Sequence, residues 1–326
     1  MSFKLGLVGP GKIANNKLAP AISMLDGVEL WSVMSRDLSR ARDFGARHGA
    51  VAPNAAYDSL DAMLDDPRLD GVVIATPDKL HASQVAAAAA KGKHVLVEKP
   101  MATDVESAKA MVAACEASGV TLAVAYHMRH HAGLKAVHAR ARAGEFGRIH
   151  HMRVQWTFRA GDDSNWRASR DVGRWWGLGG VGTHSLDQVF WFLSPQSGAV
   201  KEVQSIISKA RYGGPHDETA IVALRFEDGA TAELSSSVLF DAPSRFELYA
   251  DGANVIGEDV LSTEGDGLLS VNGKRFDYVP TNPYAGEIQD FVDAAKNGTS
   301  PAVSGARAVE NIEVLVRAAP LATELT

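Results

Sequence analysis

The sequence predicts an α/β fold in two parts, a doubly wound parallel sheet followed by an α/β domain with a large, open, mostly antiparallel sheet. Short apolar strands alternate with helical segments over residues 1–125, which is typical of βαβ units. A glycine-rich turn follows the first strand. Beyond residue 125 the pattern changes to long runs of alternating apolar and polar residues, which predict an antiparallel or mixed sheet.

Length and composition fit two globular domains. The chain has 326 residues, 46% of them hydrophobic, which is enough for two cores. We expect domains at 1–125 and 126–326, with the terminal helices packing back on the first. The net charge of -6 includes no basic block, which argues against nucleic-acid or membrane partners. One cysteine and no apolar run near ~18 residues predict a reducing, cytoplasmic location without a membrane span.

The elements of the first half follow from its apolar periodicity. Short runs rich in β-branched residues predict strands, and longer helical patterns predict the crossovers between them. The expected strands are 5–8, 28–34, 71–75, 94–97 and 120–125. The first expected helix ends near residue 24, and the others cover 38–48, 57–64, 82–90 and 104–118.

The turn after the first strand has the form G-x-G-x-x-A. Gly9 makes the turn, Gly11 lets the backbone approach a pyrophosphate, and the small Ala14 lets the helix pack on the strand. Lys12 and Ile13 open the helix, whose N-terminal amide groups face the phosphates. In this strand–turn–helix context, the motif predicts a dinucleotide site in a Rossmann domain.

The end of the second strand indicates which dinucleotide binds. An NAD site usually has an acid there to hold the ribose hydroxyls. This chain has Ser35 and Arg36, with Arg40 one turn into the next helix. A hydroxyl and guanidinium groups suit a 2′-phosphate, so NADP(H) is favoured. Asp37 keeps NAD(H) open, because a small backbone shift could bring it to the ribose.

Two further loops end on the same edge of the predicted sheet. Thr76 and Pro77 would face the nicotinamide, and His81 would begin the next helix. Glu98 and Lys99 follow strand 94–97, at the edge where open α/β sheets bind their ligands.

Lys99 is the residue of these loops best suited to proton chemistry. Partial burial disfavours a charged amine, so a lysine here can release a proton near neutral pH. Pro100 fixes the backbone after it and can sit cis. The alternative is a strand end capped by a surface ion pair.

The second half is expected to contain fewer helices. A helix is expected over 130–143, and a turn at 227–229 suggests a hairpin. The expected strands are 150–159, 200–210, 220–226, 230–238 and 246–249, and two closing helices are expected over 284–297 and 304–321.

Three motifs together resemble the glucose-fructose oxidoreductase / inositol dehydrogenase / rhizopine catabolism (Gfo/Idh/MocA) family. They are 9–14, Glu98-Lys99-Pro100, and Gly180-Val181-Gly182-Thr183-His184-Ser185-Leu186-Asp187. The resemblance covers essentially the whole chain. It implies an NAD(P)-dependent oxidoreductase of sugars, polyols or their derivatives, with a C-terminal sheet that commonly mediates a homodimer or homotetramer.

The resemblance also implies roles for individual residues. Lys99 would touch the nicotinamide ribose and the substrate, and His184 would be the general acid/base. Arg129 and Asp187 would meet the substrate, with Asp187 placed to orient the imidazole. Trp166 and Arg167 resemble a pair that reaches the cofactor in NADP-dependent relatives. Tyr284 resembles a cofactor-contacting tyrosine, and an aromatic core position is the alternative for these three.

One position departs from the family pattern. The family usually has an aspartate four residues before the histidine, where this chain has Gly180. A proton relay through that carboxylate is therefore in doubt. Gly180 favours the alternative of a non-catalytic regulator that senses nucleotide and sugar, whereas Lys99 and His184 argue for an enzyme. A redox-cycling glycosidase with bound NAD fits less well.

Several histidines suggest a metal, namely His127, His130, His131, His150 and His151. His127 and His131 have i, i+4 spacing, yet no carboxylate lies near them in the sequence. We therefore expect no metal.

Overall fold

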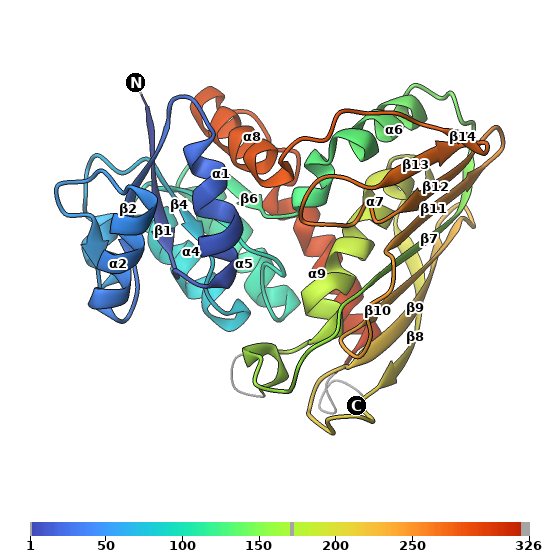
Figure 1. Ribbon diagram of the computed structural model, residues 1–326, viewed down its shortest axis with the longest axis horizontal. Coiled ribbons are helices and arrows are strands. Elements are labelled where there is room, and N and C mark those ends of the chain that lie inside the picture. The colour runs from blue at the N-terminus through green and yellow to red at the C-terminus, as the bar shows by residue number, and fades with distance from the viewer. Residues whose placement is uncertain (1, 170–172, 321–326) are drawn as a thin grey trace. The chain divides into compact units, whose positions relative to one another are not determined.

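The computed structural model describes residues 2–169 and 173–320, and the chain divides into two compact units. The first comprises Met1–Tyr126 and Tyr284–Ile312, and the second comprises His127–Pro283 and Glu313–Thr326. Figure 1 colours the chain from its blue first strands to its red last helices. A stretch late in the sequence thus clusters with the N-terminal half.

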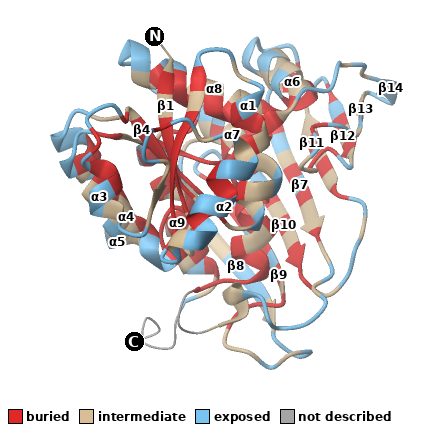
Figure 2. Cartoon of the chain, turned by 60° about the vertical axis from the view of Figure 1, so that its left-hand side comes forward, coloured by how far each residue is buried: buried red, intermediate tan, exposed pale blue. Residues whose placement is uncertain are grey.

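The first unit contains a six-stranded sheet in the order β3-β2-β1-β4-β5-β6, and all its pairings are parallel. This confirms the doubly wound sheet. Figure 2 shows β1 and β4 as buried, as expected for strands covered on both faces. The strands are β1 (Phe3–Val8), β2 (Val28–Met34), β3 (Ala56–Tyr57), β4 (Gly71–Ile74), β5 (His94–Val97) and β6 (Leu122–Val124).

Among the helices of the first unit, α2, α3 and α5 begin at polar capping residues. Asp37 caps α2 and Asp104 caps α5, each by accepting backbone N–H groups of the first turn. The helix expected over 57–64 is shorter, because Tyr57 belongs to β3 and Ser59 caps a helix that begins at residue 60. The helices are η1 (Ala14–Leu18), α1 (Ala19–Ser23), α2 (Leu38–His48), α3 (Leu60–Leu64), η2 (Asp78–Leu80), α4 (His81–Ala90), α5 (Val105–Ala117) and α8 (Pro283–Asn297).

The second unit contains an eight-stranded sheet in the order β14-β13-β12-β11-β7-β10-β9-β8. Its pairings are antiparallel apart from the parallel pair of β7 and β10, so the mostly antiparallel sheet is confirmed. The strands are β7 (Ile149–Thr157), β8 (Val200–Ser208), β9 (Thr219–Phe226), β10 (Thr231–Ser237), β11 (Arg245–Ala250), β12 (Asn254–Glu258), β13 (Leu268–Val271) and β14 (Lys274–Arg275).

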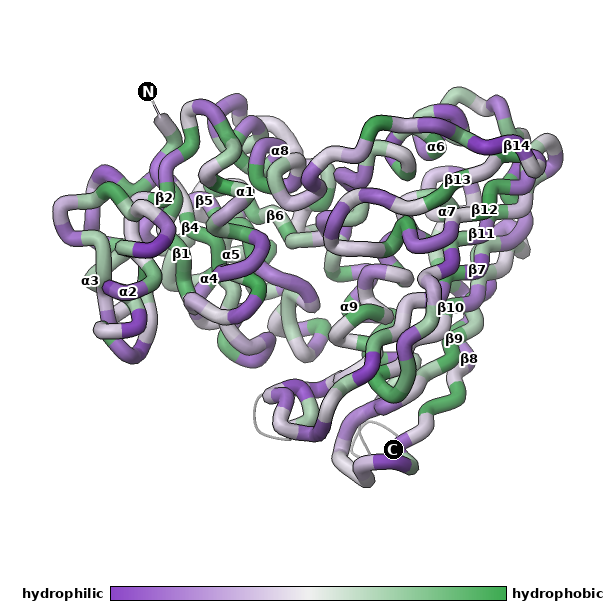
Figure 3. The backbone as a smooth tube through the Cα atoms, in the orientation of Figure 1, coloured by the Kyte–Doolittle hydropathy of each residue, from purple (hydrophilic) through white to green (hydrophobic). Residues whose placement is uncertain are grey.

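Helices of the second unit leave one face of this sheet open to water. Along β9, buried residues alternate with exposed ones, and the changing hydropathy of the strands can be followed in Figure 3. The helix α7 packs against β7 and β10. The remaining helices are η3 (His127–His130), α6 (Ala132–Arg142), η4 (Trp166–Ala168), η5 (Leu178–Gly182), α7 (Thr183–Ser197) and α9 (Gly305–Ala318).

The helix α9 passes from the first unit into the second. Its expected last residue, Leu321, lies outside the described residues. Within the described part of the chain, no helix is both long enough and apolar enough to cross a membrane.

Candidate functional site

The glycine turn after β1 has the geometry of a phosphate-binding loop. Gly9 has φ +90 and donates its N–H to the carbonyl of Met34 at 3.0 Å. A Cβ at Gly9 would lie 2.8 Å from Cγ2 of Thr76, so the turn needs glycine for its conformation and for its close approach to the next loop. A Cβ at Gly11 would have only the Gly9 oxygen within reach, at 4.0 Å. The space beside Gly11 is therefore open to a ligand.

The helix after this turn begins where the fingerprint predicts. Ala14 is fully buried, Ile13 is partly buried and Lys12 is exposed. The backbone N–H of Asn15 bonds the Gly11 carbonyl at 2.9 Å, so the chain turns directly into η1. The N-terminal amides of this helix attract anions.

Two charged side chains after β2 already have hydrogen-bond partners within the protein, and this bears on the choice between NAD(H) and NADP(H). The Asp37 carboxylate accepts the backbone N–H groups of Ser39 at 2.9 Å and Arg40 at 3.3 Å. The guanidinium of Arg40 donates to the carbonyl of Pro10 at 2.8 Å, which places it at the glycine turn. Ser35 is largely buried and Arg36 is exposed.

His81 joins the loops that follow β4 and β5. Its Nδ1 lies 3.1 Å from the Pro100 carbonyl and its Nε2 lies 2.9 Å from the Thr76 carbonyl. The ring is fully buried, so it positions the two loops through their backbone. Pro77 precedes η2 as its N-cap residue.

Lys99 directly follows the buried strand β5 and the largely buried Glu98. A carboxylate oxygen of Glu98 accepts the backbone N–H of Lys99 at 3.2 Å, and the Lys99–Pro100 peptide bond is cis. Lys99 thus stands at the carboxyl edge of the parallel sheet, in the loop after β5 that His81 joins to the loop after β4.

In the second unit, His184 lies in a buried aromatic cluster. It is the second residue of α7 and is 2% exposed. Its ring centroid lies 4.7 Å from that of His127 and 5.2 Å from that of Trp156 on β7. From the sequence, His127 suggested only a metal ligand, and Trp156 suggested no role in the site. The one available signal for Trp156 was its place in an alternating strand.

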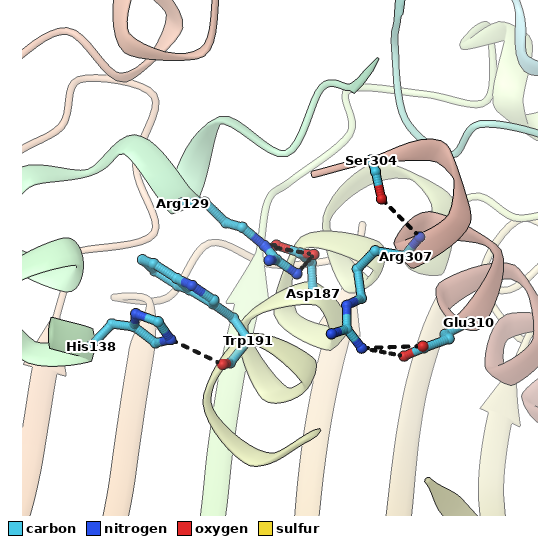
Figure 4. Close-up of polar contacts among 7 residues, drawn as sticks. All are labelled: Arg129, His138, Asp187, Trp191, Ser304, Arg307 and Glu310. Carbon is cyan, nitrogen blue, oxygen red and sulfur yellow. Dashed lines mark hydrogen bonds and ion pairs between the residues drawn. The ribbon is translucent and has the colours of Figure 1, made fainter. Parts of the chain in front are cut away.

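Arg129 and Asp187 form a buried ion pair with each other. The Arg129 Nε lies 2.9 Å from Oδ2 of Asp187, and the Nη2 lies 2.7 Å from Oδ1, with side chains 7% and 4% exposed. Figure 4 shows this pair beside Trp191, whose ring stacks on that of His138. The pair therefore links η3 to α7 just after His184.

Three other residues expected to contact the cofactor, Trp166, Arg167 and Tyr284, do not all belong to the same unit. The Arg167 guanidinium lies over the Trp166 ring at 4.2 Å, and both residues are partly buried in the second unit. Tyr284 is 2% exposed and belongs to the core of the first unit. At Gly180, a Cβ would meet only Phe158, at 3.4 Å.

The histidines do not gather into a metal site among the residues that the structure describes, where no three His, Cys, Asp or Glu side chains are arranged to hold an ion. His131 illustrates the local arrangement. Its Nδ1 accepts the backbone N–H of Leu134 at 3.1 Å and its Nε2 lies 2.9 Å from the Asp266 carbonyl, so both ring nitrogens have protein partners.

Solved structures agree with this fold. The aldose-aldose oxidoreductase of Caulobacter crescentus, solved with glycerol, superposes with a TM-score of 0.89 at 23% identity, over 97% of this chain and 96% of that one. At this level of identity, the likeness concerns the architecture.

Two relatives match this chain over nearly its full length. The D-xylose 1-dehydrogenase (NADP(+)) 2 of Haloferax volcanii is 31% identical over 91% of this chain and 90% of its own. The 1,5-anhydro-D-fructose reductase of Ensifer adhaerens is 26% identical over 92% and 90%. The family model described as an oxidoreductase family with an NAD-binding Rossmann fold matches residues 3–126, and the model of the GFO/IDH/MocA C-terminal domain matches 134–256. The chain therefore belongs to the Gfo/Idh/MocA family of NAD(P)-dependent oxidoreductases.

Proposed function

We propose that this oxidoreductase transfers a hydride between NADP(H) and a sugar, polyol or sugar derivative, with Lys99 and His184 handling the proton. The observation that carries the proposal is the combination of a Gly9–Gly11 turn shaped for phosphates with a buried imidazole at the start of α7. Relatives named as a xylose dehydrogenase, an anhydrofructose reductase and an inositol dehydrogenase support the substrate class.

The residues divide the chemistry between them. Nicotinamide supplies the hydride acceptor or donor. When an alcohol is oxidised, its O–H proton must leave as the hydride departs, and the imidazole of His184 accepts it near neutral pH. The Lys99 ammonium stabilises the alkoxide that develops on the substrate oxygen. His127 and Trp156 hold the imidazole in place and limit its contact with water.

NADP(H) is the cofactor that the residues after β2 favour. Asp37 would have to give up its hydrogen bonds to the first turn of α2 in order to reach a ribose hydroxyl. Arg40 already lies at the glycine turn, where a guanidinium can bind a 2′-phosphate. Arg40→Ala should weaken NADPH binding ~10-fold or more and leave NADH binding nearly unchanged. Arg42→Ala, at an exposed position of the same helix, is the control.

The activity test follows reduced-nicotinamide absorbance against aldoses, ketoses, polyols and deoxy or anhydro sugars, with both cofactors. Lys99→Ala and His184→Asn should each lower kcat at least ~100-fold while cofactor binding persists. Lys91→Ala removes an exposed lysine that pairs with Asp65, and it should keep full activity. Full activity in the Lys99 or His184 variant would refute that residue's assignment.

A cofactor-sensing regulator is the second candidate, favoured by Gly180. Such a protein would bind NADPH and sugar tightly and show no turnover with any member of the panel. We also propose a homodimer or homotetramer formed through the open face of the second sheet, and a cytoplasmic location.

A further inference from the structure

Asp217 is a buried carboxylate that the proposed chemistry does not use. It lies in the second unit, two residues before β9, and is 2% exposed. One carboxylate oxygen accepts the backbone N–H of Trp176 at 2.9 Å, and the other accepts that of Leu178 at 2.6 Å. Its backbone carbonyl accepts the N–H of Gly177 at 3.2 Å. One residue therefore binds three consecutive backbone N–H groups.

The segment held in this way is rich in glycine. Residues 177–182 read Gly-Leu-Gly-Gly-Val-Gly, so fixing their backbone costs more conformational entropy than fixing other residues. Gly177 is the N-cap residue of η5, which is formed by 178–182 and continues directly into α7. External contacts must therefore hold the segment in place.

Both ends of the glycine segment lie close to the second sheet or to the residues leading into it. A Cβ at Gly177 would lie 3.0 Å from Oδ2 of Asp217, and a Cβ at Gly182 would lie 3.0 Å from Oγ of Ser236 on β10. Ser236 is the register partner of Trp156, which contacts the His184 ring. The sheet thus positions the end of the segment and the imidazole through adjacent residues, and Asp217 fixes the beginning.

We propose that Asp217 is a positioning residue for the reaction. By binding the backbone N–H groups of 176–178, it fixes the start of the helix that carries His184 and so places the imidazole. A carboxylate suits this position because it accepts two N–H groups at once and its charge is favourable at a helix N-terminus. This inference rests on the acid/base role proposed for His184.

The test replaces the carboxylate by an amide of the same size. In Asp217→Asn, one of the two N–H groups faces an amide NH₂ instead of an oxygen. We expect kcat to fall ~10- to 100-fold, since a small misplacement of an acid/base group has this effect. The KM for NADPH should stay unchanged, because the Rossmann unit is unaltered.

Glu218 offers a matched control. It is fully buried beside Asp217, and its carboxylate accepts the backbone N–H groups of Arg211, Tyr212 and Gly213 instead of those of 176–178. Glu218→Gln should lower the melting temperature to a similar extent and leave kcat near the wild-type value. Equal losses of kcat in both variants would show that Asp217 has only a structural role and would overturn the proposal.

A double-mutant cycle separates this inference from the proposed function. If Asp217 acts through His184, Asp217→Asn should cause no further loss of kcat in a His184→Asn background. Full activity of His184→Asn alone would refute the acid/base role itself. An inactive His184→Asn combined with a fully active, folded Asp217→Asn would refute only the positioning role. Should Asp217→Asn not fold, Gly177→Ala displaces the same contact from the other side, and unchanged kcat there would also contradict the proposal.

Discussion

Arg129 and Asp187 form a buried ion pair, so removing either side chain leaves the charge of the other in a buried position. Asp187→Leu removes the carboxylate that pairs with a guanidinium only 7% exposed, and we expect the free energy of unfolding to fall by about 3–5 kcal/mol. The double variant Arg129→Met with Asp187→Leu should be more stable than this single variant, since it removes the buried guanidinium as well. Urea unfolding measures both. Glu202→Leu, in the exposed pair with Arg225, should cost less than about 1 kcal/mol. A double variant less stable than the single one would contradict this account.

Placing an aspartate at position 180, where the family usually has one, tests the effect of this departure from the family pattern. A Cβ there meets Phe158 at an ordinary contact distance of 3.4 Å, so Gly180→Asp can be accommodated. Its carboxylate, four residues before His184, would favour the protonated imidazole. We expect the acid limb of the kcat/KM profile to move to higher pH by about 1 unit. Gly180→Asn has the same size without the charge and should leave the limb in place. Equal shifts in both variants would exclude an electrostatic cause.

At the scale of elements, His138 couples α6 to α7. Its ring stacks on Trp191 at 4.2 Å, and its Nε2–H donates to the Trp191 carbonyl. Burial, followed by the nearby arginines, lowers the pKa of His138 to about 4. The unfolded chain therefore binds a proton at higher pH than the folded one. Stability from this group is complete above about pH 6.5 and is lost as the pH falls through 4.

The variant His138→Phe keeps a stacked ring and removes the titrating group. We expect the free energy of unfolding of the wild type to fall by about 1–2 kcal/mol more than that of the variant between pH 7 and pH 4. Chemical denaturation at a series of pH values measures this difference. Parallel curves for the two proteins would show that another group causes the pH dependence. His130, whose pKa burial lowers to about 3, contributes with the same sign in both proteins.

The sequence predicted elements wherever periodicity was strong and missed those defined by distant contacts. Strands β1, β2, β4 and β5 follow from short apolar runs, and the Gly9 turn follows from its motif. Strands β12 to β14 are five, four and two residues long, and β12 contains asparagine and glycine, so their pattern carries little signal. They form because β11 presents an edge with which β12 can pair.

The site shows the same division. Lys99 and His184 could be proposed from the sequence because each belongs to a local motif. Asp217 could not be identified in this way, since its partners Trp176 and Leu178 lie about forty residues earlier in the chain. Pairing of Arg129 with Asp187 likewise depends on a contact between residues far apart in sequence.

At the scale of the whole molecule, the open face of the second sheet carries mainly charged side chains that pair across neighbouring strands. Arg153 lies between Glu233 and Glu247, and Arg225 pairs with Glu202. Exposed pairs of this kind add little stability within one chain. They can instead set the register of an interface between two copies. In a two-fold symmetric contact, one residue of the first copy meets a second residue of the other copy and the reverse contact also forms, so side chains of opposite charge can face each other.

The apolar part of this face lies at its β8 edge, and it is where we expect two copies to meet. Ile206 and Ile221 are opposite each other in register and are 71% and 47% exposed, and an exposed apolar pair on an edge strand favours association. Ile206→Glu should therefore lower the mass measured by light scattering or sedimentation from oligomer to monomer. Met24→Glu, which alters a residue 62% exposed in the other unit, should leave the mass unchanged. An oligomer that survives Ile206→Glu would place the interface elsewhere, because a buried carboxylate without a partner costs several kcal/mol in each copy.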